Sequence, residues 1–355
     1  MIFLDKNVLV TGGTGSLGKT LVERVLTGER GIPRKLVVLS RDEGKQHEMR
    51  LHYMAKESQT DEVIYENFKR VLEFRIGDVR SYADVCHAMR DMDIVINAAA
   101  LKQVPTCEYF PEQAVMTNCG GPINIVRAVH ERQATPEVVV GVSTDKACKP
   151  INVMGMSKAI QERIFIAGNV LSPSTRFVCV RYGNVLASRG SVIPMFHEQI
   201  RRRGPVTVTV PEMTRFLLSL NQAVDTVFEA LAKARPGEVI VPKAPSATVW
   251  DVAQALIGER DIEIKIIGIR PGEKMHEIMV AEEEYRHTVA RGDHYAILPM
   301  LPELRDETET VEPALDKEFS SGDNVMDLAA TRALLAKGKL LVEDRDFNDT
   351  AELLR

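Results

Sequence analysis

The amino-acid sequence predicts an α/β fold in which a doubly wound parallel sheet is followed by a smaller C-terminal lobe. Short apolar runs alternate with helical patterns throughout the first half of the chain. These runs are rich in β-branched residues and lack polar alternation, as a sheet covered on both faces requires. Strands and helices in strict alternation favour a parallel sheet, and this alternation loosens after about residue 183.

The first half of the chain contains five strand–helix pairs. The expected strands are residues 6–13, 35–40, 71–78, 93–100 and 137–143. The expected helices are residues 16–26, 42–57 and 81–92, a long helix after residues 109–118, and residues 152–171. We therefore assign residues 1–183 to a first domain built on one parallel sheet.

The second half is less regular. Short strands at 205–210 and 261–269 lie among loops, and we assign residues 184–300 mainly to the second lobe. A helix at 221–234 and a strand at 237–242 are expected to bring residues 220–242 back to the first domain. Residues 301–355 begin with an acidic stretch and include an expected helix at 327–338. This tail is interpreted either as a disordered appendage or as an arm that packs on a neighbour.

Composition excludes several classes of protein. The 355 residues carry a formal net charge of -5, which argues against a general nucleic-acid or membrane-surface binder. The five cysteines are scattered without a C-x-x-C pair, so neither a zinc site nor a disulfide framework is expected, and a reducing compartment is favoured. No segment approaches the roughly 18 apolar residues that insertion into a membrane requires. We expect a cytoplasmic protein that uses no metal.

A glycine-rich turn follows the first expected strand. Gly12, Gly15 and Gly18 can close the turn, admit a pyrophosphate to the backbone and let the helix pack on the strand. The free N–H groups of the following helix then face the phosphates. Three spaced glycines are weak evidence alone, but their place between a strand and a helix predicts a dinucleotide site. The rest of this phosphate-binding turn is expected to be Thr14, Ser16 and Leu17.

The second strand bears on the choice of cofactor. Ser40 and Arg41 stand where an NAD enzyme usually presents an acid to the ribose diol, and Lys45 follows one turn later. Arg41 can grip a 2′-phosphate, so NADP is favoured over NAD. In the alternative interpretation Arg41 and Lys45 are surface charges and Asp42, otherwise a good helix N-cap, binds the ribose. Beyond these residues, the adenine is expected at Asp78 and Val79, and the nicotinamide half beside the small residues Ala98, Ala99 and Ala100.

Several motifs together resemble one known family. They are TGGTGSLGK, SRDEGKQ, GDVRSY, NAAALKQVPTCEYFPEQAVMTN, VSTDKA, RYGNVLASRGSVIP, MTRF and RPGEKMHE, in this order from residue 3 to about residue 290. The chain resembles the extended short-chain dehydrogenases with a Rossmann domain that dehydrate UDP-N-acetylglucosamine. It is most similar to the inverting 4,6-dehydratases of capsule, O-antigen and flagellar-sugar pathways, whose smaller lobe binds the UDP-sugar.

The resemblance implies an internal oxidation, elimination and reduction. In that family carbon 4 of the sugar is oxidised by NADP⁺, the carbon 5 proton leaves with the carbon 6 hydroxyl, and carbon 6 is then reduced. By resemblance, Asp145 is the acid at carbon 6 and Lys146 is the base at carbon 5, with inversion at carbon 5. A lysine base needs a lowered pKa, which burial and nearby cations can supply. Spacing alone would also allow a simple ion pair in a loop.

One family residue is missing. Where the usual Tyr-x-x-x-Lys motif has tyrosine, this chain has Met154, as in the capsular branch that the sequence resembles. A thioether carries no proton at neutral pH. Lys158 keeps its place on the same helix face and is expected at the nicotinamide ribose. Thr144 or a water molecule is expected to take the proton from the carbon 4 hydroxyl.

The resemblance also implies a set of residues for the UDP-sugar. Arginine forks suit a diphosphate and a glutamate suits a ribose diol. These residues are Asn184, Arg189, Arg215, Arg270 and Glu273. Lys102 follows the fourth expected strand and is expected to face the same cleft and bind the sugar or a phosphate, although its spacing equally allows a surface role. The resemblance further implies a homo-oligomer. The alternatives that stay open are a UDP-sugar 5,6-dehydratase, a UDP-sugar 4-epimerase and, outside enzymes, an NADP-binding regulatory protein with a silenced site.

Overall fold

One large parallel sheet organises the molecule. The computed structural model describes residues 1–55, 62–186, 191–269, 272–305 and 312–344. The strands of the large sheet are β1 (Asn7–Thr11), β2 (Lys35–Ser40), β3 (Leu72–Ile76), β4 (Ile94–Asn97), β5 (Val138–Val142), β6 (Arg176–Val180), β9 (Val239–Pro242), β13 (Thr288–Arg291) and β14 (His294–Ile297). Within the described residues their order is β13-β14-β9-β6-β5-β4-β1-β2-β3.

The pairing of these strands confirms the predicted fold class. The strands β1 to β6 and β9 pair in parallel, while β14 and β13 add an antiparallel edge. Every residue of β4 and β5 is buried, as expected for apolar runs without polar alternation. The chain leaves β1 and β4, which are neighbours, toward opposite sides of the sheet. Ligands bind beside the carboxyl ends of strands at such a point.

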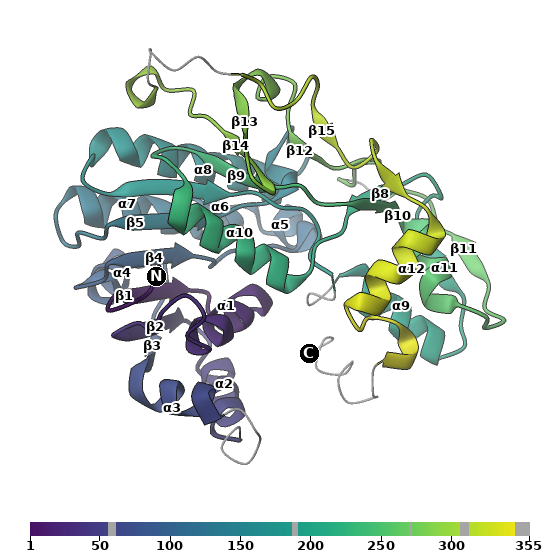
Figure 1. The fold of residues 1–355 in the computed structure, drawn as a ribbon, viewed down its shortest axis with the longest axis horizontal. Helices are drawn as coiled ribbons and strands as arrows, with labels where there is room; N and C mark the ends of the chain where they lie inside the picture. Colours follow the sequence, from purple (N-terminus) through teal and green to yellow (C-terminus); the bar gives the residue numbers. More distant parts are fainter. Residues whose placement is uncertain (56–61, 187–190, 270–271, 306–311, 345–355) are drawn as a thin grey trace.

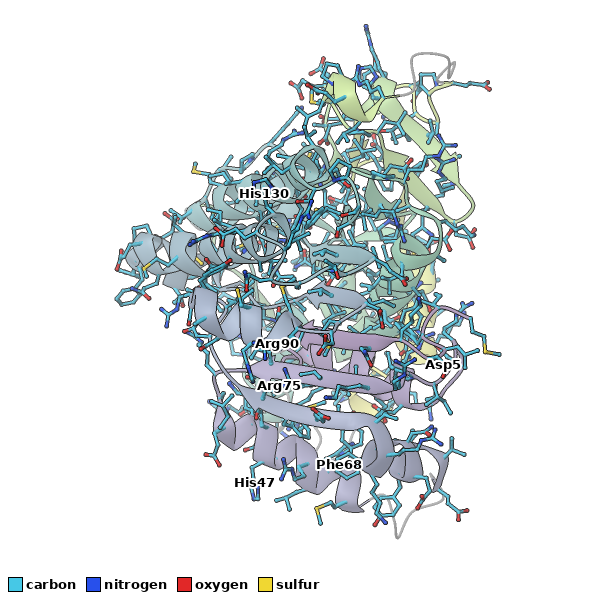
Figure 2. The ribbon with its side chains drawn as sticks, turned by 90° about the vertical axis from the view of Figure 1, so that its left-hand side faces the viewer. Asp5, His47, Phe68, Arg75, Arg90 and His130 are labelled. Atoms are coloured by element: carbon cyan, nitrogen blue, oxygen red, sulfur yellow. The ribbon has the colours of Figure 1, made fainter. Side chains whose placement is uncertain are left out.

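Helices cover both faces of this sheet (Figure 1). The helices are α1 (Ser16–Leu26), α2 (Glu43–Ala55), α3 (Glu62–Val71), α4 (Tyr82–Met89), α5 (Val104–Tyr109), α6 (Pro111–Asn118), α7 (Gly120–His130), α8 (Val153–Leu171) and α10 (Leu220–Lys233). One layer contains α1, α3 and α10, and the other contains α4, α7 and α8. The sequence predicted one helix at 42–57 and none at 62–71. The structure instead has α2 and α3, joined by Phe68 stacked on Tyr53 with ring centroids 5.4 Å apart. Phe68 is labelled in Figure 2.

The smaller lobe has an apolar core of its own. It contains α9 (Val192–Arg201), α11 (Val249–Ile257) and α12 (Leu328–Lys337), with β7 (Val206–Val208), β8 (Thr214–Phe216), β10 (Ser246–Thr248), β11 (Ile264–Ile266) and β16 (Val325–Met326). This core includes Phe196, Leu256 and Leu335. β11 is shorter than the strand expected at 261–269 and pairs with β7 in parallel. Figure 1 shows α9, α11 and α12 together at one end of the molecule.

Residues 312–344, the last that the structure describes, pack on the rest of the same chain. The helix expected at 327–338 is α12, which lies against α11 and buries Leu335 completely. Upstream, β12 (Ile278–Val280) pairs with β15 (Phe319–Ser320), so the acidic stretch also has a place in the fold. Short 3₁₀ helices complete the described elements: η2 (Asp145–Ala147), η3 (Tyr285–His287), η4 (Pro302–Leu304) and η5 (Val342–Asp344). In the described part of the chain, no helix is long and apolar enough to cross a bilayer.

Candidate active site

A cavity of about 740 Å³ lies at the carboxyl ends of the parallel strands and reaches the smaller lobe. The turn after β1 forms one wall and fits tightly against the residues after β4. Gly12 has a φ of 68°, and a Cβ there would lie 2.7 Å from the backbone of Ala99. A Cβ on Gly18 would lie 2.5 Å from the Cα of Gly13, so α1 packs against the turn only without side chains.

The first turn of α1 is suited to an anion. Its N-cap is Gly15, which has no side chain that could accept hydrogen bonds from the first N–H groups of the helix. These groups belong to a stretch that lines the cavity from Thr14 to Gly18. An uncapped helix N-terminus in a glycine turn fits the pyrophosphate of a dinucleotide. The structure therefore brings together the cofactor residues that the sequence predicted here: Gly12, Thr14, Gly15, Ser16, Leu17 and Gly18.

The end of β2 forms the adjoining wall. The Ser40 hydroxyl shares a hydrogen bond of 2.9 Å with that of Thr14. Arg41 lines the cavity with a side chain that is 51% exposed. Asp42 accepts a hydrogen bond of 3.0 Å from the backbone N–H of Lys45, and its carboxylate pairs with the Lys45 ammonium at 2.7 Å. Asp42 thus caps the start of α2, which is the structural role that the sequence offered as an alternative to ribose binding.

Asp78 also lines the cavity but already has partners. Its carboxylate accepts hydrogen bonds from Arg80 at 2.6 and 2.8 Å and lies 3.6 Å from Arg41. Burial opposes ionisation, yet the hydrogen bonds from Arg80 outweigh it and lower the pKa of Asp78. An adenine amino group would therefore compete with Arg80 for this carboxylate. The remaining predicted cofactor residues, Val79, Ala98, Ala99 and Ala100, line the same cavity.

The loop after β5 presents the predicted acid–base pair. Thr144 caps η2 and donates a hydrogen bond of 2.8 Å to Oδ1 of Asp145. Lys146 Nζ donates to the same oxygen at 3.0 Å. Thr144 and Lys146 line the cavity, whereas Asp145 is fully buried directly behind them. Oδ2 of Asp145 has no hydrogen-bond partner among the described residues.

The charge on Lys146 differs from the expectation for a lysine base. A lowered pKa would need burial and nearby cations, but the structure places two carboxylates beside Nζ, Asp145 at 3.0 Å and Glu277 at 3.4 Å. Burial alone would lower the pKa of Lys146, and Arg215 also lowers it. The two carboxylates outweigh both effects and raise the pKa. The expected lowering is therefore wrong for the protein without ligands, and Lys146 rests as an ammonium.

Helix α8 carries the segment in which methionine replaces tyrosine. Asn152 caps this helix through the N–H of Gly155 at 2.8 Å and donates to the carbonyl of Gly272 at 3.0 Å. A Cβ on Gly155 would lie 2.2 Å from the carbonyl oxygen of Lys146, so only glycine lets α8 approach η2 this closely. Met154 is 4% exposed, lines the cavity and packs with Cys107 and Ala114.

Lys158 lies one helical turn after Met154. Its Nζ donates to the carbonyl of Val142 at 2.7 Å and to Oε1 of Gln161 at 2.8 Å. An ammonium has three N–H groups, so one remains for the cavity that Lys158 lines. Burial is the largest cause that lowers the pKa of Lys158 to about 8. This lysine, not Lys146, is the one with a pKa near neutrality.

The predicted substrate residues divide into two groups. Lys102, Asn184, Arg215 and Glu273 line the cavity, while Arg189 and Arg270 fall outside the described residues. The side-chain oxygen of Asn184 is buried and has no partner in the described structure, so it can accept a bond from a ligand. Arg215 donates to the carbonyls of Thr214 at 2.7 Å and Lys274 at 3.1 Å.

Sequence reasoning missed Glu277. This glutamate is 2% exposed, lines the cavity and lies close to both Lys146 and Arg215. The only sequence signal was its place as the last letter of the motif RPGEKMHE, in which Glu273 received the attention. Its partners are 131 and 62 residues away in the chain, so no local pattern could connect them.

Comparisons with known proteins show the family to which the chain belongs. The family model described as polysaccharide biosynthesis protein matches residues 8–299. A protein of Rickettsia conorii named UDP-glucose 4-epimerase is 43% identical over 301 residues, which are 83% of this chain and 84% of that protein. A protein of Rickettsia prowazekii with the same name is 42% identical over 302 residues, which are 83% of this chain and 84% of that protein.

Two solved structures are similar over most of the fold. The X-ray structure of Pen from Bacillus thuringiensis has a TM-score of 0.82 and 34% identity, and the match covers 96% of this chain and 100% of that chain. The structure of DesIV, a dTDP-glucose 4,6-dehydratase from Streptomyces venezuelae with NAD and TYD bound, has a TM-score of 0.63 and 20% identity. That match covers 76% of this chain and 86% of that chain and shows a shared fold.

Proposed function

This chain belongs to the polysaccharide biosynthesis protein family, and from that premise we propose that it is a nucleotide-sugar 4,6-dehydratase. Its substrate is UDP-N-acetylglucosamine or a related UDP-sugar, its cofactor is NADP, and its product is a 4-keto-6-deoxy sugar inverted at carbon 5. The observation that carries this proposal is the cluster of Asp145, Lys146 and Glu277 beside the dinucleotide-binding turn.

The cofactor half of the cavity supports a nicotinamide dinucleotide. The uncapped N-terminus of α1 would hold the pyrophosphate, and Lys158 would hold the nicotinamide ribose through its remaining N–H. Arg41 and Lys45 line the ribose end, where a 2′-phosphate would meet two cations. A dinucleotide bound there would supply reversible oxidation of the sugar.

The pair of Asp145 and Lys146 supports an elimination. In the ion pair the shared proton lies on Lys146, and its transfer along the 3.0 Å hydrogen bond gives a carboxylic acid beside a neutral amine. The amine can take the carbon 5 proton while the acid protonates the departing carbon 6 hydroxyl. Both groups then return to the ion pair, so this step needs no other proton source. Reprotonation from the opposite face would invert carbon 5.

Removal of the carbon 4 hydroxyl proton falls to other groups because Met154 cannot take it. Thr144 donates its own hydrogen to Asp145, which leaves its oxygen able to accept one. Lys158 has a pKa near 8 and can share the proton at neutral pH. We assign this role to both residues: Thr144 accepts a hydrogen bond from the carbon 4 hydroxyl, and the neutral amine of Lys158 takes the proton and becomes an ammonium.

A UDP-sugar 4-epimerase is the second candidate, because the Rickettsia relatives carry that name. An epimerase oxidises and reduces only carbon 4 and expels no hydroxyl. It has no elimination step for the acid and base that the resemblance assigns to Asp145 and Lys146. The cluster around Lys146 therefore favours the dehydratase.

Incubation with UDP-N-acetylglucosamine or with UDP-glucose in deuterated water separates the two reactions. A dehydratase gives a product that has lost one water and gained deuterium at carbon 5, seen by mass spectrometry and NMR. Unchanged mass with an inverted carbon 4 indicates the epimerase. Lys146→Met is the matched control, since it should abolish deuterium uptake while cofactor still binds. Asp145→Asn should slow the loss of the carbon 6 hydroxyl by about 10²–10⁴-fold. A protein that binds NADP but converts neither sugar would refute both candidates.

A further inference from the structure

Glu277 is a buried carboxylate whose two oxygens are in different situations. Oε1 lies 3.4 Å from Lys146 Nζ and 3.7 Å from Arg215 Nε. Oε2 is buried without a hydrogen-bond partner in the part of the chain that the structure describes. Burying an unpaired carboxylate oxygen is costly, so its retention beside a ligand cavity points to a role there.

The backbone of Glu277 is fixed by a distant part of the chain. Its N–H donates to the Ser321 hydroxyl at 2.9 Å, and its carbonyl accepts from the Ser321 N–H at 2.8 Å. Ser321 in turn shares a hydrogen bond of 2.7 Å with Thr214, the neighbour of Arg215. Ser321, in the acidic stretch, is thus linked by hydrogen bonds to Glu277 and, through Thr214, to the strand that carries Arg215. A carboxylate fixed in this way can orient a flexible lysine.

We propose that Glu277 is a positioning residue that holds the Lys146 ammonium against Asp145. This inference rests on the proposed function only in giving Lys146 a catalytic task. Lys146 has a long side chain that is 23% exposed, so without a second carboxylate it could turn toward solvent. With Glu277 on one side and Asp145 on the other, Nζ stays within hydrogen-bond reach of its acid partner.

The charged groups around Lys146 determine in which direction its pKa changes when Glu277 is neutralised. The titratable and charged groups that face Nζ are Asp145 from its own loop, Glu277 before β12 and Arg215 on β8. Lys158 on the packed helix α8 points to Val142 and Gln161 instead. When Glu277 loses its charge, Asp145 still raises the pKa of Lys146, while burial and Arg215 still lower it. The pKa of Lys146 therefore falls. A base with a lower pKa is deprotonated at lower pH.

The first test is the pH profile of kcat/KM for dehydration of UDP-N-acetylglucosamine. In Glu277→Gln the alkaline limb, where the ion pair loses the Lys146 proton, should move to lower pH by about one unit or more, the effect of one opposite charge at close range. Glu277→Asp keeps the charge and should restore the wild-type limb more than glutamine does. The matched control is Glu282→Gln, an exposed carboxylate nearby, which should leave the limb unchanged. A Glu277→Gln limb that coincides with the wild-type limb would overturn the proposal.

The second test needs no substrate. Lysines of the purified protein are methylated with ¹³C-formaldehyde, and the Lys146 resonance is identified by its absence from Lys146→Arg. Its titration should move to lower pH in Glu277→Gln and stay in place in Glu282→Gln. If this shift appears in a protein that performs no dehydration, the positioning role of Glu277 stands and the proposed function fails. If Lys146 titrates alike in wild type and Glu277→Gln, the positioning role fails even in an active dehydratase.

Discussion

Replacing Lys158 by methionine should change how the stability of the protein depends on pH. Burial lowers the pKa of Lys158 from 10.5 to about 8. Because one pKa unit corresponds to about 1.4 kcal/mol, the charged lysine costs the folded state about 3 kcal/mol below pH 8. Between about pH 8 and 10.5 the unfolded chain keeps this proton and the folded chain has lost it. The free energy of unfolding therefore rises with pH in that window.

Urea unfolding of the nucleotide-free protein measures this contribution. From about pH 7 to about pH 9.5 the free energy of unfolding of wild type should rise by about 2 kcal/mol relative to Lys158→Met. Burial raises the pKa of Tyr53 and Tyr182, so these groups oppose the rise at high pH, but they cancel in the difference. Lys158→Arg is the control, since arginine keeps its charge throughout and should lack the rise.

A difference between wild type and Lys158→Met that is flat across this range would refute the reasoning. It would mean that Lys158 keeps its ordinary pKa in the folded protein. The ammonium would then be solvated rather than held between Val142 and Gln161. Its role as a group that shares a proton at neutral pH would fail with it.

Three further substitutions test the site. Arg41→Ala should narrow the preference for NADP⁺ over NAD⁺ by about 1–3 kcal/mol in calorimetry, and equal affinities in wild type would contradict the assignment. Gly155→Ala should push α8 away from the carbonyl of Lys146 and lower stability by about 1–3 kcal/mol, whereas an unchanged melting temperature would show that the close approach is not needed. Met154→Ala should keep appreciable dehydratase activity. If only Met154→Tyr forms product and transient NADPH absorbance, the wild-type site is silenced.

The fold could be predicted as far as it depends on local pattern. The strands β1, β2, β4 and β5 and the helices α1 and α8 are buried where their apolar runs indicate, whereas β3, at the edge of the sheet, has no buried residue. The short strands of the smaller lobe could not be predicted in this way. β12 has three residues and β15 has two, and they pair although about 40 residues separate them. Strands of this length are determined by their partners and have too few residues for a period to appear.

In the candidate site, too, some features follow from local sequence pattern and others only from the fold. The glycine turn, the pair Asp145–Lys146 and Lys158 stand in short motifs, so their positions could be found from the sequence. Their charge states could not, because these depend on groups that the fold brings together. Glu277 raises the pKa of Lys146 from 131 residues away, and burial under the sheet lowers the pKa of Lys158. A sequence motif names the titrating group, but its pKa is set by three-dimensional surroundings.

The exchange of tyrosine for methionine at position 154 is best understood through the same surroundings. Asn152 still caps α8, Gly155 still admits the carbonyl of Lys146, and Lys158 still reaches the cavity. The close approach of α8 to η2 and the position of Lys158 on the cavity are therefore both present although residue 154 is methionine. Met154 fills an apolar cluster at its edge and offers no proton. Under the proposed function, proton handling would fall to Thr144 and Lys146 on one wall, with Asp145 buried behind them, and to Lys158 on the other. On this reasoning the loss of tyrosine relocates the acid–base chemistry and does not remove it.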